Sequence, residues 1–336
     1  MSAYWLLPAA ALSSLCLTWL VRQYAMSREL IDLPGERSSH RRATPRGGGV
    51  AVALTYLGGV SILYGAGLVS LEFFAAVSGG GGLVALVGFL DDHRHVPARW
   101  RLLAHFIAAA WALYWFGGAP PVMGAADPTW FLTGIAVLCI VWLVNLYNFM
   151  DGIDGIAGIE TITVCFGAAL LHFMVAPAED LWLGPSLLLA STAGFLFWNF
   201  PPARIFLGDS GSGFLGFVLA VFCVQASWVA LEVFWALAIL LGVFIVDATV
   251  TLVRRKLQGR RVYEAHRSHA YQYAARKHGN HARVSLAIGV INLLWLLPLA
   301  LLVGTASLDW TIGWPIAYAP LIWLAFRYKA GATENV

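Results

Sequence analysis

The stretch WFLTGIAVLCIVWLVNLYNFMDGIDG, residues 130–155, decides the fold of this chain. Up to residue 149 it is apolar and long enough to cross the hydrocarbon core of a bilayer as a helix, which takes about 20 residues. Near its end a polar residue recurs at every third position, as Asn145, Asn148, Asp151 and Asp154. Residues three apart are neighbours on a helix, and a polar flank of this kind is too costly to expose to lipid. The stretch therefore predicts a membrane helix whose polar flank faces the bundle interior or a wet cavity.

The composition of the whole chain agrees with a membrane protein. Of its 336 residues 60% are apolar and 12% are charged, and the mean hydropathy is +0.74. Too little polar surface is available to coat a water-soluble globule. We expect an all-α polytopic membrane protein that forms a single domain over residues 1–336, with about eleven transmembrane helices. The predicted spans are 4–24, 47–69, 72–90, 102–118, 130–149, 155–176, 181–198, 212–229, 232–253, 284–303 and 310–326.

The distribution of basic residues predicts the orientation of these spans. If the N-terminus lies outside, all 21 Lys and Arg fall in the inner segments or at the inner end of a span. The opposite loops contain no Lys or Arg but contain acids such as Glu72, Asp127, Glu179, Asp180 and Asp309. Because basic residues collect on the cytoplasmic side of a membrane, we predict an outer N-terminus and an inner C-terminus. The main cytoplasmic loops would be about 25–46, 91–101, 150–154, 199–211 and 254–283.

Two acidic motifs lie on this predicted inner face. The pair Asp91-Asp92 follows the predicted span 72–90, where a helix C-terminus repels carboxylates and the basic face offers no general reason for them. Two solvated carboxylates are the alternative, but a bound cation or a proton transfer would explain the position. The second motif is the run of polar residues from 145 to 154, which could simply form polar contacts between helices. Two amides and two carboxylates beside glycines favour a metal or phosphate site instead.

Two further motifs favour the binding of phosphates. The segment Gly208-Asp209-Ser210-Gly211-Ser212-Gly213 lies at the start of a predicted span. Amides of a glycine-rich turn at a helix N-terminus bind anions, and the adjacent carboxylate can hold Mg²⁺. The segment His266-Arg267-Ser268-His269 lies in the last large inner loop. A basic loop that touches anionic lipid is the alternative there, whereas paired histidines favour binding or protonation of a pyrophosphate.

In their order and spacing these motifs resemble the polyprenyl-phosphate N-acetylhexosamine-1-phosphate transferase family. That family includes phospho-MurNAc-pentapeptide translocase and the GlcNAc-1-phosphate transferases that start O-antigen and teichoic acid assembly. The resemblance covers nearly the whole chain, and all its motifs fall on the predicted cytoplasmic face. The residues that carry it are Thr44-Pro45-Arg46-Gly47-Gly48-Gly49, Gly88-Phe89-Leu90-Asp91-Asp92, Asn148-Phe149-Met150-Asp151-Gly152-Ile153-Asp154-Gly155, Leu207-Gly208-Asp209-Ser210-Gly211-Ser212 and Arg267-Ser268-His269.

The resemblance implies roles for particular residues. Asp91, as candidate base, and Asp92 would assist the attacking lipid phosphate, while Asp209 would be the main Mg²⁺ ligand. The implied catalytic residues are Asp91, Asp92, Asp154 and His269. The implied substrate-binding residues are Arg46, Asn148, Asp151, His266 and Arg267. The implied metal ligands are Asp209 and Asp151. Many family members have a second histidine where this chain has Tyr271, and His266 is an additional one upstream.

We therefore expect an enzyme of the bacterial inner membrane with its active site on the cytoplasmic face. It would transfer a HexNAc-1-phosphate from a UDP-sugar to undecaprenyl phosphate, release UMP and start an O-antigen or related surface glycan. The donor would be UDP-GlcNAc or a 6-deoxy relative (FucNAc or QuiNAc), with UDP-MurNAc-pentapeptide as the alternative. Mg²⁺ is the expected cofactor, with Mn²⁺ as a substitute. The expected partners are the two substrates and the lipid bilayer, with no nucleic acid; both a monomer and a homodimer stay open.

Two other classes compete with this reading. A transporter or lipid-linked sugar carrier would line a path at the bilayer midplane with buried carboxylates, and Asp247 and Glu160 within predicted spans favour it. The other acids cluster at one face instead. An intramembrane aspartyl protease would use Gly-x-Gly-Asp, but the first glycine position here is Phe206.

Overall fold

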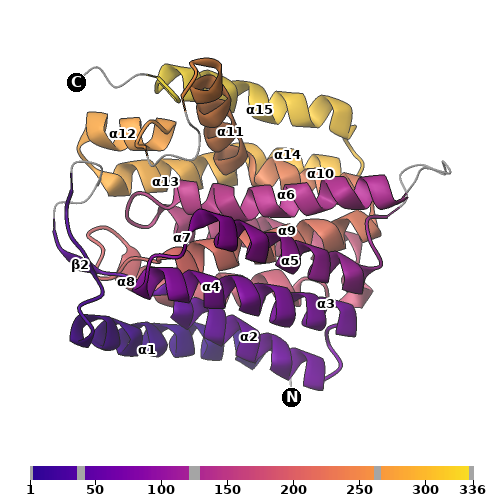
Figure 1. Cartoon of the computed structure of the whole chain (residues 1–336). Helices are drawn as coiled ribbons and strands as arrows, with labels where there is room; N and C mark the ends of the chain where they lie inside the picture. The colour runs from indigo at the N-terminus through magenta and orange to yellow at the C-terminus, as the bar shows by residue number, and fades with distance from the viewer. Residues whose placement is uncertain (1–2, 36–41, 121–128, 261–265, 333–336) are drawn as a thin grey trace.

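The computed structural model describes residues 3–35, 42–120, 129–260 and 266–332, and it is almost entirely helical. The helices pack side by side and many cross the molecule from one end to the other (Figure 1). The first half comprises η1 (Ala3–Trp5), α1 (Leu6–Ser27), β1 (Ile31–Asp32), β2 (Thr44–Pro45), α2 (Gly49–Gly65), α3 (Leu71–Ala75), η2 (Ala76–Gly81), α4 (Gly82–His93), α5 (Ala98–Phe116) and α6 (Thr129–Met150). The second half comprises α7 (Ile156–Val175), η3 (Pro177–Glu179), α8 (Leu183–Asn199), α9 (Asp209–Val229), α10 (Leu231–Leu240), α11 (Gly242–Leu257), α12 (Ala270–His278), α13 (His281–Ile291), η4 (Asn292–Leu296), α14 (Leu297–Gly304) and α15 (Trp310–Arg327).

The all-α polytopic fold is confirmed. Each of the eleven predicted spans coincides with one helix or with consecutive helices. Within the described residues, six helices are long and apolar enough to cross a membrane, or seven if α10 and α11 form one span. The count of eleven therefore stays a prediction. Residues 36–41 and 261–265 of the predicted inner loops, and Asp127 of a predicted outer loop, lie outside the described residues.

Three of the predicted spans are not single regular helices. The span predicted at 72–90 contains the π-helical turn η2. Its glycines admit large neighbours, since a Cβ on Gly80 would lie 2.4 Å from the Phe217 ring. A second π-helical turn, η4, interrupts the span predicted at 284–303. The span predicted at 232–253 breaks at Leu241, where α10 and α11 meet at 70°.

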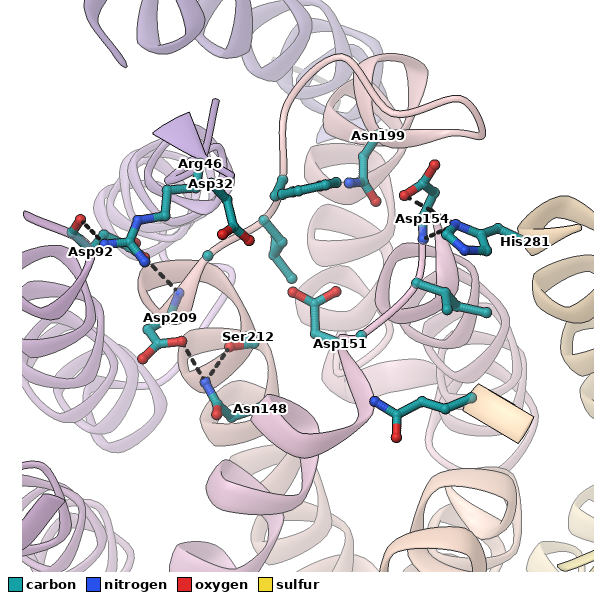
Figure 2. A pocket seen from close by; sticks show the side chains of 16 residues that line it. Asp32, Arg46, Asp92, Asn148, Asp151, Asp154, Asn199, Asp209, Ser212 and His281 are labelled. Atoms are coloured by element: carbon teal, nitrogen blue, oxygen red, sulfur yellow. Dashed lines mark hydrogen bonds and ion pairs between the residues drawn. The ribbon is translucent and has the colours of Figure 1, made fainter. Parts of the chain in front are cut away.

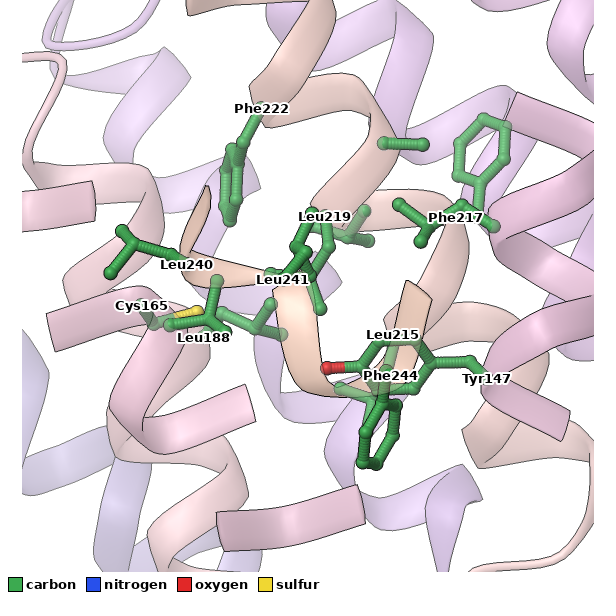
Figure 3. Packing of buried hydrophobic residues seen from close by; sticks show 14 of the residues in the cluster. Tyr147, Cys165, Leu188, Leu215, Phe217, Leu219, Phe222, Leu240, Leu241 and Phe244 are labelled. Carbon is green, nitrogen blue, oxygen red and sulfur yellow. The ribbon is translucent and has the colours of Figure 1, made fainter. Parts of the chain in front are cut away.

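The core of the bundle surrounds α9, which is buried along most of its length. Phe214, Phe217 and Phe222 of this helix are fully buried, and Figure 3 shows two of them among side chains from neighbouring helices. Nearby, the rings of Tyr147 and Phe244 lie 4.9 Å apart and join α6 to α11. A close-packed apolar core of this kind fixes the position of the helix that passes through it. The first turn of α9 is therefore held at a defined place at one end of the bundle.

The outer surface of the helices is strongly apolar. Trp130 and Leu294 are each 74% exposed, and Tyr114 is 76% exposed. In water such surfaces would be an aggregation hazard, whereas in a bilayer they meet lipid tails and the interfacial layers that Trp and Tyr favour. The exposure pattern agrees with a multi-pass membrane protein.

The buried acids that favoured a transporter both join neighbouring helices. Glu160 of α7 accepts a hydrogen bond of 2.7 Å from the side-chain amide of Asn292 in η4. Asp247 of α11 accepts bonds of 2.9 Å from the backbone amides of Ala270 and Tyr271, at the start of α12. Polar contacts of this kind are a common way to hold helices together in a membrane. Packing thus accounts for these two carboxylates.

Candidate active site

The first turn of α9 is anchored by a carboxylate from another helix. Gly208 precedes the helix with φ +76°, which favours glycine, and a Cβ there would lie 2.6 Å from the Asp92 carboxylate. The two Asp92 oxygens accept hydrogen bonds from the backbone amides of Asp209 (3.0 Å) and Ser210 (3.2 Å). Asp92 is only 3% exposed. It therefore caps α9 from α4 and joins two of the predicted motifs.

The chain before α9 is tied to the first inner segment. β1 and β2 pair antiparallel, with Asp32 opposite Thr44. The amide of Phe206 donates to the carbonyl of Pro45 (2.8 Å), and the amide of Gly48 donates back to the carbonyl of Phe206 (2.9 Å). These bonds place Arg46 beside α9 and α4, where its guanidinium donates to the backbone carbonyl of Asp92 (2.7 Å).

Asn148 connects the end of α6 to the start of α9. Its side-chain amide donates to Asp209 Oδ1 (2.8 Å) and to the Ser212 hydroxyl (3.1 Å), as Figure 2 shows. The four polar residues that we predicted on one flank of the helix therefore do not share one environment. Asn145 instead donates to the Val141 carbonyl (2.7 Å) within α6. Asp151 and Asp154 lie beyond the end of the helix, in the segment before α7.

The predicted glycine-rich turn is shorter than the sequence suggested. We expected residues 208–213 to form the turn and the helix to begin near 212. The structure starts α9 at Asp209, so Gly211 and Gly213 lie inside the helix. A Cβ on Gly211 would lie 2.6 Å from the Cα of Gly49. These glycines allow close helix packing, which is a different use of small residues from an anion-binding turn.

Arg101 of α5 joins two of the acidic motifs, and sequence reasoning missed it. Its Nη1 lies 2.5 Å from Asp91 Oδ2 and 2.6 Å from Asp209 Oδ2. The other Asp91 oxygen accepts a bond from the backbone amide of Val96 (2.7 Å). Arg101 belongs to a predicted inner segment, where basic residues are expected for topological reasons. Nothing in the sequence distinguishes it from its basic neighbours.

A cavity of about 280 Å³ opens beside these residues. Figure 2 shows the labelled carboxylate and amide side chains gathered around it. Its wall carries five carboxylates and, among Lys and Arg of the described residues, only Arg46. The lining residues are Asp32, Arg46, Asp92, Asn148, Asp151, Gly152, Ile153, Asp154, Asn199, Phe206, Leu207, Gly208, Asp209, Ser212, Gln272 and His281. Such a wall needs additional positive charge before it can take an anionic substrate.

Asp151 is the clearest sign of a missing cation. In the described part of the chain no group donates a hydrogen bond to its carboxylate. Burial, reinforced by Asp209 and the other carboxylates of the cavity, raises the pKa of Asp151 well above its ordinary value. An opposite charge nearby would favour the ionised form. The residues present therefore fit a metal ion held by Asp209 and Asp151.

The donor set fits magnesium better than zinc. The described residues contain no group of three or more His, Cys, Asp or Glu side chains arranged around one metal position. A structural or catalytic zinc site needs at least three such ligands. Magnesium commonly takes one or two protein carboxylates and completes its shell with substrate phosphates and water.

Asp154 is paired with His281, a second residue that sequence reasoning missed. His281 Nδ1 lies 3.3 Å from Asp154 Oδ1, and the other Asp154 oxygen accepts a bond from the Ala203 amide (3.0 Å). His281 begins α13 and lines the cavity. Asp32 also lines it and was missed. One histidine or aspartate in a polar loop carries too little signal to be singled out by sequence alone.

The histidine loop lies next to the cavity but does not form its wall. Asp247 caps α12 as described above, and His269 Nδ1 lies 3.4 Å from Asp247 Oδ1. His269 is 2% exposed and stacks on His266 at 5.0 Å. The Tyr271 hydroxyl donates to the Phe149 carbonyl (3.0 Å), next to Asp151. Of the described residues in this region, only Gln272 lines the cavity; His266, Arg267 and His269 do not.

His266 is not a cation at neutral pH. Burial, together with the neighbouring His269 and Arg255, lowers its pKa to about 3. A neutral imidazole can still offer one donor and one acceptor. A neutral His266 suits the binding of a pyrophosphate, which is one of the two roles that the sequence suggested for the paired histidines.

The sequence was compared with known proteins. The profile of glycosyl transferase family 4 matches residues 74–227, which contain Asp91, Arg101, Asn148 and Asp209. A probable undecaprenyl-phosphate N-acetylglucosaminyl 1-phosphate transferase of Bacillus subtilis is 28% identical over 77% of this chain and 74% of its own length. An undecaprenyl-phosphate alpha-N-acetylglucosaminyl 1-phosphate transferase of Thermotoga maritima is 29% identical over 80% and 81%.

A third relative matches over a shorter stretch. A phospho-N-acetylmuramoyl-pentapeptide-transferase of Rhodopseudomonas palustris is 27% identical over 53% of this chain and 58% of its own length. The acidic motifs that these comparisons cover are the ones that the structure gathers at one end of the bundle. The apolar helices and the matches together show a multi-pass membrane protein that is similar to glycosyl transferase family 4 over residues 74–227 and to polyprenyl-phosphate N-acetylglucosaminyl 1-phosphate transferases over most of its length.

Proposed function

We propose that this protein transfers a HexNAc-1-phosphate from a UDP-sugar to undecaprenyl phosphate and releases UMP, with Mg²⁺ as cofactor. The observation that carries the proposal is the cavity at one end of the bundle, in which Asp92, Asn148, Asp151 and Asp209 come together from separate helix ends. An acid-rich pocket at the end of apolar helices suits a substrate whose tail lies in lipid and whose phosphate reaches the interface.

The reaction joins groups that are all negatively charged. An oxygen of the lipid phosphate attacks the phosphorus that carries the sugar, the bond from that phosphorus to the bridging oxygen breaks, and UMP leaves with that oxygen. The barrier is largely electrostatic. Mg²⁺, held by Asp209 and Asp151, would supply positive charge at the phosphates. Asn148 holds the Asp209 carboxylate in place, and Asp92 holds the helix turn that carries it.

Further residues of the cavity suit the two substrates. Arg46 is fixed by its bond to the Asp92 carbonyl and offers a cation to a phosphate. Asp154, oriented by His281 and the Ala203 amide, presents a carboxylate to a donor group of the nucleotide sugar. We assign Arg267, His266 and His269 to the diphosphate side of the site, which requires the histidine loop to move toward the cavity when substrate binds. We assign Asp91 as the base, and the Arg101 guanidinium beside it keeps its carboxylate in the ionised form that can accept a proton.

The donor and the biological role follow from the sequence pattern and the relatives. The Bacillus and Thermotoga relatives are named as N-acetylglucosaminyl 1-phosphate transferases. We propose a HexNAc donor, UDP-GlcNAc or its FucNAc or QuiNAc relatives, and a role in starting O-antigen or a related surface glycan. Every Lys and Arg falls on the predicted inner side of the membrane, which supports a cytoplasmic active site in the bacterial inner membrane.

Purified protein in detergent tests the reaction. UMP release should require both Mg²⁺ and undecaprenyl phosphate, with Mn²⁺ as a substitute metal. Asp209→Ala should reduce turnover at least about 100-fold, as expected for loss of a group that stabilises transition-state charge. Asp180→Ala, which changes an acid far from the cavity, is the matched control. Metal-independent release, or full activity of Asp209→Ala, would contradict the proposal.

A screen of UDP-sugars identifies the donor. Radiolabel from UDP-HexNAc donors should appear in the lipid extract, with the preferred donor giving the highest kcat/KM. Label from UDP-MurNAc-pentapeptide alone would overturn the donor assignment while leaving the reaction class intact.

A further inference from the structure

Arg101 bridges two carboxylates through a single nitrogen. Its Nη1 lies 2.5 Å from Asp91 of α4 and 2.6 Å from Asp209 of α9. The two aspartates come from different motifs, and α5 supplies the cation between them. Charge-assisted hydrogen bonds between a guanidinium and a carboxylate are among the strongest that side chains form. Arg101 is thus the counter-ion of this carboxylate pair in the absence of a metal.

The bridge uses only part of the guanidinium. An arginine side chain has five N–H donors on three nitrogens. In the described part of the chain only Nη1 has side-chain partners, while Nε and Nη2 make no hydrogen bond to protein. The Arg101 side chain is 30% exposed. Spare donors at a wet position leave Arg101 able to bind a further anion and to change partners.

The bridge also conflicts with the metal that the proposed function requires. Asn148 already donates to Asp209 Oδ1, and Arg101 donates to Oδ2. Each oxygen could still accept a second partner, but a divalent cation on Asp209 would lie close to the positive charge of Arg101, so we expect one of these donors to be displaced. The guanidinium is the one that leaves, because its positive charge repels the metal at such a short distance, whereas the neutral amide of Asn148 does not.

We propose that Arg101 is an exchangeable counter-ion that gives up Asp209 when the metal and the nucleotide sugar bind. This inference rests on the proposed function. Asp91 then keeps the guanidinium close to the site, and the freed N–H groups bind the diphosphate of the UDP-sugar. Arg101 in this way couples the two ligands: the metal releases the arginine for the diphosphate, and the diphosphate draws it from Asp209. By linkage, each ligand raises the affinity of the other.

Binding of Mn²⁺ alone tests the exchange. The dissociation constant is measured by electron paramagnetic resonance on the full chain in detergent, without nucleotide or lipid phosphate. Arg101→Gln should bind Mn²⁺ about tenfold more tightly than the natural protein, because a competing and repelling charge is gone. Arg101→Lys keeps the positive charge, so its dissociation constant for Mn²⁺ should stay within about threefold of that of the natural protein. The same Arg101→Gln protein should lose turnover, with a raised KM for the UDP-sugar.

A neighbouring arginine provides the matched control. Arg99 lies two residues away and stacks on Trp100 at 5.7 Å, with no carboxylate partner among the described residues. Arg99→Gln removes the same charge from the same helix turn and should leave Mn²⁺ affinity within about twofold. Arg101→Met gives a second neutral variant if Arg101→Gln does not yield a monodisperse protein.

The outcomes separate the inference from the proposed function. Equal or weaker Mn²⁺ binding in a folded Arg101→Gln or Arg101→Met protein would overturn the exchange, since Arg101 would then organise the carboxylates rather than compete with the metal. An equal gain in Mn²⁺ affinity in the Arg99→Gln protein would also overturn the exchange, because the loss of any nearby positive charge would then explain the result. Absence of UMP release by the natural protein would overturn the proposed function and leaves the binding measurement unaffected.

Discussion

Asp92 and Asp209 show that acidic residues in adjacent motifs take different positions. Asp92 is buried and binds two backbone amides, whereas Asp209 lies at the cavity with its oxygens held by Asn148 and Arg101. The order of the motifs and the family resemblance predicted that both belong to one site. Both line the cavity, but the sequence could not show that Asp92 would cap α9, since that depends on how α4 packs against α9.

Asp92→Asn tests the capping role. The side-chain amide can accept only one of the two N–H bonds and turns its NH₂ group toward the other, so a buried donor is left unsatisfied. We expect a loss of about 1–3 kcal/mol in stability, seen as a lower midpoint of thermal unfolding, and a large loss of UMP release. A variant with unchanged thermal stability and reduced turnover would show that Asp92 acts on substrate instead.

The low pKa of His266 leads to a prediction about pH. With a pKa of about 3, His266 is neutral at both pH 6 and pH 8. Its folded-state pKa lies below the ordinary value, so the charged form appears only in acid. His266→Gln should raise the KM for the UDP-sugar roughly 3- to 10-fold, the loss of one neutral hydrogen bond. The ratio of the two KM values should be the same at pH 6 and pH 8; a larger ratio at pH 6 would indicate a charged His266.

At the scale of elements, the site depends on how closely α2 and α9 approach. Gly49 begins α2 and Gly211 lies in the first turn of α9, and a Cβ on Gly49 would lie 2.1 Å from the Gly211 Cα. The sequence predicted Gly211 as part of a turn for phosphate, and Gly49 belonged to a motif of the family resemblance. Their use in helix packing could not be foreseen, because it depends on two segments about 160 residues apart in the chain.

Gly211→Ala should therefore disturb both packing and activity. The added methyl group meets backbone and cannot be accommodated by a side-chain rotation, so we expect a cost of about 1–3 kcal/mol and displacement of Asp209. Thermal unfolding and UMP release measure the two effects. Gly58→Ala in α2 is the control, since nothing lies within 4 Å of its added Cβ. Equal behaviour of the two variants would contradict the close contact.

For the whole molecule, the helices place the motifs at one end of the bundle, where β2 and α12 also lie (Figure 1). Hydrogen bonds confirm this arrangement between α4 and α9, between α6 and α9, and between the segment after α6 and α13. The orientation of that end relative to the membrane stays a prediction from the placement of Lys and Arg.

Labelling of single cysteines tests the orientation. In a background with all four natural cysteines replaced, Ser307→Cys should react with a membrane-impermeant maleimide in intact cells. Arg276→Cys should react only after the membrane is permeabilised, because it lies on the predicted inner loop. Both positions are exposed, so accessibility does not depend on burial. Reaction of both from the same side would refute the predicted topology.

The sequence by itself determined the membrane class, the approximate places of the helices and most of the acids that line the cavity. These follow from local properties, since apolar length fixes where a helix can cross a bilayer and an unexplained acid at a span end is visible in the chain. Only the tertiary structure decided the breaks in the helices, the capping of α9 by Asp92, and the partners Arg101 and His281. Those features depend on contacts between segments distant in sequence, and a side chain's partner is set by helix packing that no local pattern encodes.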